Sequence, residues 1–191
     1  MGKIYADIDE KVRGFIGGQH LFFVATAPSG SGGHVNCSPK GRSSFAVLGP
    51  TSVAYVDFVG SGVETIAHVR QNGRIVIMFC AFEGPPKIVR LHGHATVVEP
   101  NDPEFAALAR AFPPLPELGV RSIIRVDVAR ISDSCGYGVP LLSYEGERNH
   151  MTAWAERKGA EGIVAYERER NAASIDGLPG LASAVVAADS E

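Results

Sequence analysis

A glycine- and serine-rich break between a strand pattern and a helix pattern is the clearest candidate for chemistry in this sequence. An apolar run ends at Phe58 and Val59, continues as Gly60-Ser61-Gly62, and passes into a helical pattern from Val63. The first N–H groups of a helix lack intrahelical partners and the helix dipole is positive there, so such a junction can bind a phosphate. The alternative is a tight turn in which Ser61 is the N-cap of the helix.

A second candidate is the cationic segment Asn36-Cys37-Ser38-Pro39-Lys40-Gly41-Arg42, which ends a predicted strand. A cofactor phosphate would be stabilised by Lys40, and by Arg42 beside it, acting together with the turn at 60–62. A solvated surface turn is the alternative interpretation.

The third candidate is Cys135-Gly136-Tyr137-Gly138-Val139-Pro140, where two glycines flank a tyrosine. Glycines let the backbone approach a flat ligand and Tyr137 offers a ring face, which suits a planar aromatic cofactor or a subunit contact. No base partner for Cys135 is identifiable, so we interpret it as a small packed residue and predict no nucleophile.

The histidines indicate no metal site. A period of two places Arg90, His92 and His94 on one face of a strand, but no carboxylate or cysteine at ligand spacing completes a metal set. By residue type and position, His68 is more typical of a packed helix residue than of an acid or base.

The secondary structure predicted around these residues is typical of a mainly antiparallel β protein. The patterns predict strands over residues 21–26, 35–38, 52–58, 74–82, 87–99 and 122–134. They predict helices over 9–17, over 63–72 stopped by Gly73, over 102–112 capped by Asp102, and beyond 147. A hairpin loop is expected at the glycine cluster 28–33 and a turn at 176–180. Hairpin-type spacing with few helices between strands predicts a six-stranded, closed or nearly closed antiparallel barrel with peripheral helices.

The length and composition of the chain are those of a protein with one hydrophobic core. The chain has 191 residues, 45% of them hydrophobic, and a net charge of −3. We expect a barrel domain over residues 1–146, a helical extension over 147–181 and a disordered tail over 182–191. The charge favours neither nucleic acid nor a membrane surface as a partner. Three scattered cysteines and the lack of a signal or spanning segment predict a reducing, cytoplasmic location.

The sequence lacks the motifs of several enzyme classes. It contains no G-x-S-x-G elbow, no His-Glu-x-x-His and no G-x-G-x-x-G at a strand-to-helix junction. The sequence has turns that can bind a phosphate, but no recognisable pair of catalytic acid and base residues. This combination indicates a cofactor that carries out the chemistry itself.

Several motifs in order resemble the pyridoxamine 5′-phosphate oxidase-like flavoproteins. They are Ser38-Pro39-Lys40-Gly41, the stretch from Gly60 to His68, the stretch from Met78 to Pro86, Ser134 to Pro140, and Ile175 to Leu181. The resemblance runs over residues 5–181. It implies an FMN-binding split barrel and a homodimer with two FMN clefts between the subunits, each cleft using residues of both chains.

For this sequence, the resemblance implies that Lys40 contacts the flavin phosphate, with the turn at 60–62 beside it. It also implies that Cys37 and Ser38 lie along the flavin. The predicted cofactor-binding set is Cys37, Ser38, Lys40, Gly60, Ser61, Gly62, Thr65, His68, Cys135, Gly136 and Tyr137. The family elements that bind pyridoxamine phosphate have no counterpart after Glu147, so we expect a different small-molecule substrate.

The sequence therefore predicts a dimeric, FMN-dependent oxidoreductase whose catalytic residues are not identifiable. Two alternatives stay open. One is a non-catalytic flavin- or haem-binding sensor or carrier, because one fold can host both kinds of protein. The other is an enzyme that uses a deazaflavin or another phosphorylated cofactor.

Overall fold

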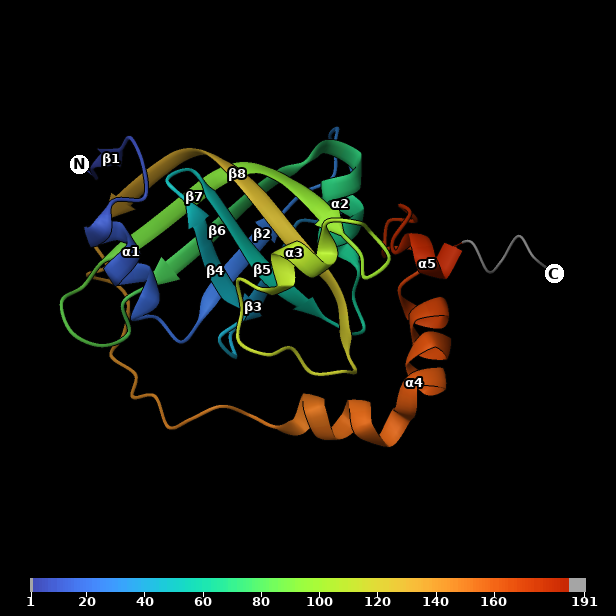
Figure 1. The fold of residues 1–191 in the computed structure, drawn as a ribbon. Helices are drawn as coiled ribbons and strands as arrows, with labels where there is room; N and C mark the ends of the chain where they lie inside the picture. Colours follow the sequence, from blue (N-terminus) through green and yellow to red (C-terminus); the bar gives the residue numbers. More distant parts are fainter. Residues whose placement is uncertain (1, 186–191) are drawn as a thin grey trace.

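One antiparallel sheet of eight strands organises the chain (Figure 1). The structure is a computed structural model and describes residues 2–185. The strands follow the order β3-β2-β6-β7-β8-β5-β4, and β1 pairs with β8 beside this path. The strands are β1 (Ile4–Tyr5), β2 (Phe22–Thr26), β3 (Asn36–Lys40), β4 (Phe45–Gly49), β5 (Ser52–Phe58), β6 (Arg74–Cys80), β7 (Ile88–Val98) and β8 (Val120–Ser134). The helices are α1 (Glu10–Gly17), α2 (Glu64–Asn72), α3 (Phe105–Ala109), α4 (His150–Arg170) and α5 (Ala182–Val185).

The sheet curls so that its two ends approach each other. Phe45 of β4 lies 5.2 Å from Phe22 of β2 and 5.0 Å from Phe79 of β6, measured between ring centroids. No hydrogen-bonded pairing joins β3 to β4 within residues 2–185. The predicted antiparallel β class with peripheral helices is confirmed.

The predicted number of six strands is wrong because β1 and β4 were missed. β1 has only two residues. β4 has the sequence FAVLG, a short apolar run without the alternation that identifies a half-buried strand. Its pairing with β5 comes from a tight turn at Pro50 and Thr51.

Two helix starts also differ from the sequence prediction. α2 begins at Glu64 with Val63 in the N-cap position and no side-chain cap, so Ser61 is not its N-cap. α3 spans only Phe105–Ala109, and the Asp102 carboxylate accepts a hydrogen bond from the Glu99 N–H at 2.6 Å instead of capping the helix. The chain turns at Glu99 to Asp102 before α3 can begin. Gly73 ends α2 as predicted, with a φ of 71° that favours glycine.

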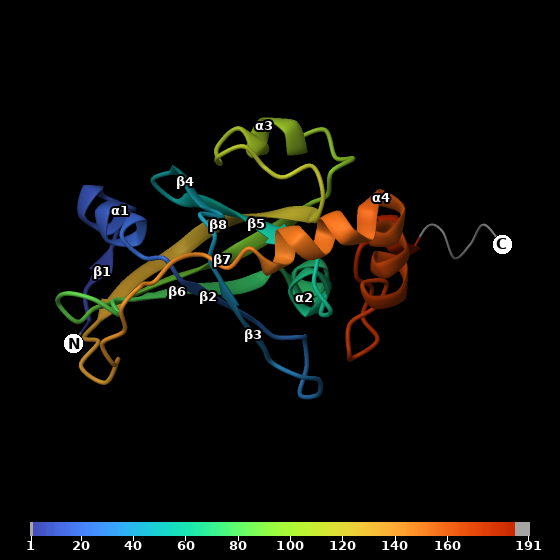
Figure 2. The ribbon, with the colours of Figure 1, turned by 90° about the horizontal axis from the view of Figure 1, so that it is seen from below.

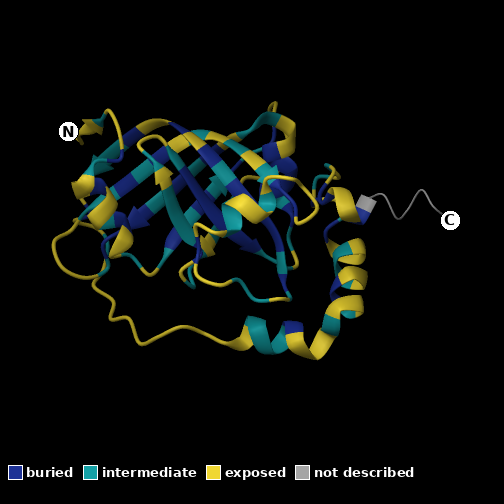
Figure 3. Ribbon diagram, viewed as in Figure 1, coloured by how far each residue is buried: buried dark blue, intermediate teal, exposed yellow. Residues whose placement is uncertain are grey.

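The C-terminal part lies along one end of the sheet. Figure 2 shows the chain crossing from the end near the N-terminus to α4 at the opposite end of the molecule. α4 bends at Gly159, whose φ of 66° and ψ of 173° are not helical. Only Ala155 and Ile163 of α4 are buried, and most of the helix surface is exposed or half-buried (Figure 3). Residues 182–185 form α5 instead of belonging to a disordered tail, and residues 186–191 lie outside the described residues.

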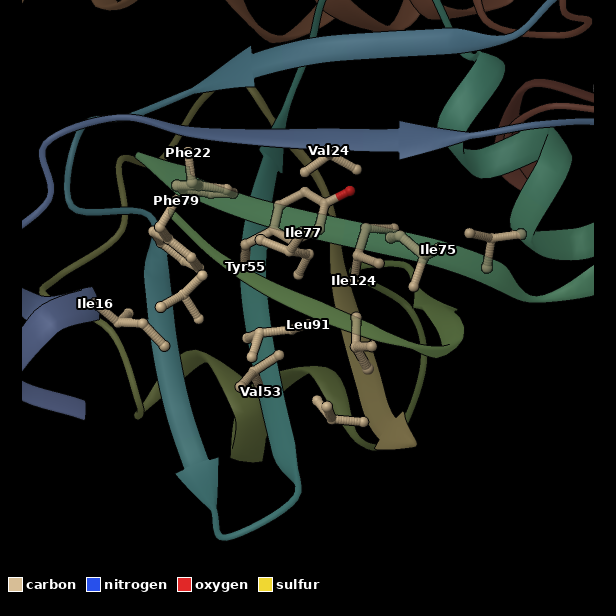
Figure 4. Close-up of a cluster of buried hydrophobic side chains, with 14 of the residues drawn as sticks. Ile16, Phe22, Val24, Val53, Tyr55, Ile75, Ile77, Phe79, Leu91 and Ile124 are labelled. Carbon is tan, nitrogen blue, oxygen red and sulfur yellow. The ribbon is translucent and has the colours of Figure 1, made fainter. Parts of the chain in front are cut away.

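The core lies inside the curl of the sheet. Alternate residues of the strands point inward, as Phe22 and Val24 of β2 do (Figure 4). Tyr55, Ile77 and Leu91 are fully buried there. Each large apolar side chain contributes roughly 1.5–3 kcal/mol on burial, so this core fixes the strands that carry the site. Within residues 2–185, none of the helices has the length and apolar character needed to cross a bilayer.

Candidate functional site

A cavity of about 600 Å³ opens where β3 ends and where β5 passes into α2. The four cationic side chains in its lining are Lys40, Arg42, Arg121 and Arg148, and the two carboxylates are Glu64 and Glu147. The cavity is therefore lined by more positive than negative side chains. An anionic ligand is favoured there over a cationic one.

The cavity wall contains a buried ion-paired cluster. The Asp57 carboxylate is fully buried and lies 2.7 Å from the Lys40 Nζ and 2.7 Å from the Arg121 Nε. Burial alone would raise the pKa of Asp57, but Arg121 and Lys40 outweigh it and hold the pKa below its usual value of 3.8. Two cations thus share one carboxylate, and the cluster carries one net positive charge beside the cavity.

Arg121 was missed by the sequence analysis. Its guanidinium is only 5% exposed and lines the cavity. The available signal was Asp57, because a carboxylate in an apolar strand needs a cationic partner. Which arginine supplies it depends on the pairing of β5 with β8, where Asp57 lies opposite Ser122.

The turn at 60–62 leads from β5 into the first turn of α2. Its Gly62 carbonyl accepts a hydrogen bond from the Arg121 Nη1 at 2.7 Å, and its Gly60 carbonyl accepts one from the Asn171 Nδ2 at 2.9 Å. The start of α2 has no side-chain cap. Since the first amides of a helix lack intrahelical partners, they are available to an anion.

A polar network extends from the cavity into the interior. The Ser38 hydroxyl donates to the Asn36 Oδ1 at 3.1 Å, and the Asn36 Nδ2 donates to the Thr65 Oγ1 at 2.9 Å. Ser38, Asn36 and Thr65 line the cavity. Behind them, the Thr26 hydroxyl lies 2.9 Å from the His68 Nδ1. The network holds two hydroxyl groups at the cavity surface.

His68 is fully buried behind the cavity and is not among its lining residues. Its Nε2 has no hydrogen-bond partner in the described part of the chain. Burial lowers the pKa of His68, so the imidazole is neutral at neutral pH. This position fits a packed helix residue.

The chain segment before α4 forms the outer wall of the cavity. The Tyr144 ring stacks on His20 with centroids 3.7 Å apart and an interplanar angle of 6°. The Glu147 carboxylate accepts a hydrogen bond from the Arg42 N–H at 3.2 Å, and the Arg42 guanidinium donates to the Thr152 hydroxyl at 2.5 Å. Arg42 therefore ties β3 to the outer wall. No pattern in the sequence predicted this wall.

The predicted site residues fall into four groups. Ser38, Lys40, Gly60, Gly62 and Thr65 line the cavity. Cys37 and Ser61 are exposed in an adjoining depression that Gly62 and Glu64 share with the cavity. His68 lies behind the cavity, and the remaining three residues lie elsewhere.

Those three, Cys135, Gly136 and Tyr137, follow the far end of β8. β8 passes the cavity at Arg121 and ends at Ser134, about 45 Å further along the strand. Gly136 is packed against Lys87, where an added Cβ would lie 2.8 Å from the Lys87 amide nitrogen. Tyr137 is 84% exposed. One chain does not bring these residues to its own cavity.

His92 and His94 are both exposed on β7, which agrees with their predicted shared face. Across residues 2–185 no group of three or more His, Cys, Asp or Glu side chains is placed to hold a metal ion.

Comparison with known proteins identifies the family. The family model described as pyridoxamine 5′-phosphate oxidase matches residues 8–135. The chain belongs to the pyridoxamine 5′-phosphate oxidase family. It is 41% identical to the Aspergillus flavus protein ustO, itself described as a member of this family, over 95% of this chain and 78% of that protein. The resemblance read from the motifs is confirmed.

Solved structures show the same fold. A HupZ variant of Group A Streptococcus covers 66% of this chain and 99% of its own at 24% identity, with a TM-score of 0.51. A candidate pyridoxamine 5′-phosphate oxidase from Lactobacillus delbrueckii covers 68% of this chain and 98% of its own at 17% identity, with a TM-score of 0.52. The antiparallel sheet with its helices is thus the fold of this family.

Proposed function

We propose that this family member is an FMN-binding flavoprotein with oxidoreductase activity, and that its cavity binds the flavin phosphate. The observation that carries the proposal is the buried cluster of Lys40, Asp57 and Arg121, which presents one net positive charge beside the uncapped start of α2. A cationic cluster and a helix start at one point form an anion site. The resemblance to FMN-binding family members supplies the identity of the ligand.

The residues present fit such a group. A cavity of about 600 Å³ is within the usual size of cofactor sites. The Lys40 Nζ, on a side chain 19% exposed, can donate to a phosphate oxygen without leaving Asp57, because an ammonium has three donors. The hydroxyls of Ser38 and Thr65 add polar contacts at the same wall.

The flavin and the protein would have different roles in this arrangement. The flavin supplies hydride transfer when bound. The chain's own residues bind the phosphate, and the stacked rings of His20 and Tyr144 border the cavity where a flat ligand would lie. The substrate is proposed to be a small molecule other than pyridoxamine phosphate.

We further propose that the curled sheet is a split barrel and that two copies form a homodimer with the cofactor clefts between them. The segment after β8 supports this, since its Tyr137 is 84% exposed and the neighbouring Gly138 is also exposed, which suits a flat ligand that its own chain does not bring to it. In a two-fold dimer, that segment would complete the cavity of the other copy.

The test is the visible absorption spectrum of the purified protein before and after adding FMN, with the released cofactor identified by mass. Flavin bands and released FMN are the expected result. A haem spectrum, a deazaflavin mass, or a protein that stays colourless after FMN is added would each overturn the FMN proposal. If FMN binds but neither a reduced nicotinamide nor an acceptor ever changes its redox state, the oxidoreductase part fails and a non-catalytic carrier remains.

A further inference from the structure

The chain after α4 returns to the back of the turn at 60–62. Asn171, the residue that ends α4, is fully buried there. Its Nδ2 donates to the Gly60 carbonyl at 2.9 Å, and its Oδ1 accepts from the Arg121 Nη1 at 3.2 Å. The same Nη1 donates to the Gly62 carbonyl at 2.7 Å. Asn171 and Arg121 together hold both glycine carbonyls of the turn.

Asn171 is itself held rigidly. Its N–H donates to the Glu167 carbonyl at 2.7 Å, and its carbonyl accepts from the Leu181 N–H at 2.9 Å. Leu181 is buried in the main core. Gly180 lies so close to the Asn171 carbonyl that a Cβ would not fit between them. The amide side chain therefore has one fixed position relative to the turn.

The position of these carbonyls fixes the direction of the following amides. A trans peptide is planar, so its C=O and its N–H point in opposite directions. When the Gly60 and Gly62 carbonyls point toward Asn171 and Arg121, the N–H groups of Ser61 and Val63 point the other way. The Gly60 carbonyl also accepts from the Arg121 Nη1, but at 3.5 Å, so loss of the shorter Asn171 contact would leave the Gly60 peptide less firmly oriented.

We propose that Asn171 is a positioning residue for anion binding, which gives the site its preference for a phosphorylated ligand without touching that ligand. The inference rests on the proposed function, since it assumes that the turn at 60–62 meets a phosphate. The C-terminal segment is thus part of the phosphate site through Asn171.

The experiment compares the dissociation constants of FMN and of riboflavin, which lacks the phosphate. In wild type, FMN binds more tightly than riboflavin. Asn171→Ala is expected to reduce this preference roughly five- to tenfold, the effect of one buried hydrogen bond, with the affinity for riboflavin unchanged. Asn171→Asp is expected to act in the same direction, because a carboxylate cannot donate to the Gly60 carbonyl. It provides the same test if the alanine variant does not fold.

Glu99→Gln is the matched control. The Glu99 carboxylate anchors the same C-terminal segment by accepting from the N–H groups of Ala182 at 2.8 Å and Ser183 at 3.2 Å, and it has no contact with the turn. This variant is expected to lower the melting temperature and to keep the preference for FMN.

The outcomes separate this inference from the proposed function. An unchanged FMN preference in both Asn171 variants, or an equal weakening of FMN and riboflavin, would overturn the positioning role while leaving flavin binding intact. The same result in Glu99→Gln as in Asn171→Ala would also overturn it, because general loosening would then be sufficient. A wild type that binds neither flavin would refute the proposed function, and the positioning role with it.

Discussion

The two ends of β8 carry similar residues in different surroundings. At one end Arg121 and Lys40 flank Asp57, which is fully buried. At the other end Lys87 lies 3.7 Å from Asp133, with their side chains 29% and 20% exposed. The Tyr5 hydroxyl donates to Asp133 at 2.5 Å, and this bond raises the pKa of Tyr5 to about 12.

The difference in burial decides what each end can do. Charges removed from water act strongly on a nearby ligand, whereas half-exposed charges are screened by solvent and salt. The end at Asp57, the buried end, lines a cavity. The end at Asp133, called the exposed end because its ion pair is partly open to solvent, precedes the segment 135–137. The proposed phosphate site therefore lies at the end whose ion pairs share a buried carboxylate. Four predictions test this contrast, from the largest expected effect to the smallest.

Replacing the buried arginine should have the largest effect. Arg121→Leu leaves Asp57 with one partner and removes the bonds to Gly62 and Asn171. We expect the free energy of unfolding to fall by about 3–5 kcal/mol, measured by urea denaturation. Lys87→Ala, at the exposed end, should cost at most about 1 kcal/mol. Equal losses for the two variants would show that burial does not separate the two ends.

Replacing the buried-end lysine should weaken cofactor binding. Lys40→Ala removes a charge-assisted contact to the phosphate of about 1.5–3 kcal/mol, which is roughly a 10- to 150-fold rise in the dissociation constant of FMN. Fluorescence titration measures it. Lys87→Ala is the control and should bind FMN as wild type does. If Lys40→Ala also binds FMN with wild-type affinity, the phosphate does not lie at Lys40.

The exposed end is tested by Tyr137→Ala. The side chain is 84% exposed, so the free energy of unfolding should stay within about 0.5 kcal/mol of wild type. If a second copy supplies this ring to the flavin, the affinity for FMN should fall by about 0.5–1.5 kcal/mol. Urea denaturation and FMN titration measure the two effects, and sedimentation shows whether the variant is still a dimer. A dimer with unaltered FMN affinity would remove Tyr137 from the proposed cleft.

The smallest effect should come from His68, behind the buried end. Burial lowers its pKa below the usual 6.5. Folding favours the neutral imidazole. The contribution of His68 to the free energy of unfolding is therefore complete above pH 6.5 and is lost as the pH falls toward the lowered pKa. His68→Asn should flatten the decline of the melting temperature as the pH falls from 6.5 toward the lowered pKa of His68. A decline as steep as that of wild type would assign the acid sensitivity to other groups.

Local patterns in the sequence predicted one side of the site. The apolar strand, the glycine turn and the helix stopped by Gly73 are neighbours along the chain, so their residues suffice to identify them. Lys40 was predicted correctly at a strand end, which the structure places beside the cavity, and its contact with a phosphate stays a prediction.

The other side of the site depends on contacts between distant residues. Asn171 is 111 residues from Gly60, and Arg121 is 59 residues from Gly62. Strand register and the path of the C-terminal segment decide those contacts, and no local pattern encodes either one. The pairing of Lys40 with Asp57 was missed for the same reason.

A crystal structure of the protein reconstituted with FMN is the most direct test of the central claim. The account predicts the phosphate within hydrogen-bonding distance of the Lys40 Nζ and of the first amides of α2, with Asn171 still bonded to the Gly60 carbonyl. A phosphate bound elsewhere, with the cavity at Lys40 filled only by water, would contradict it.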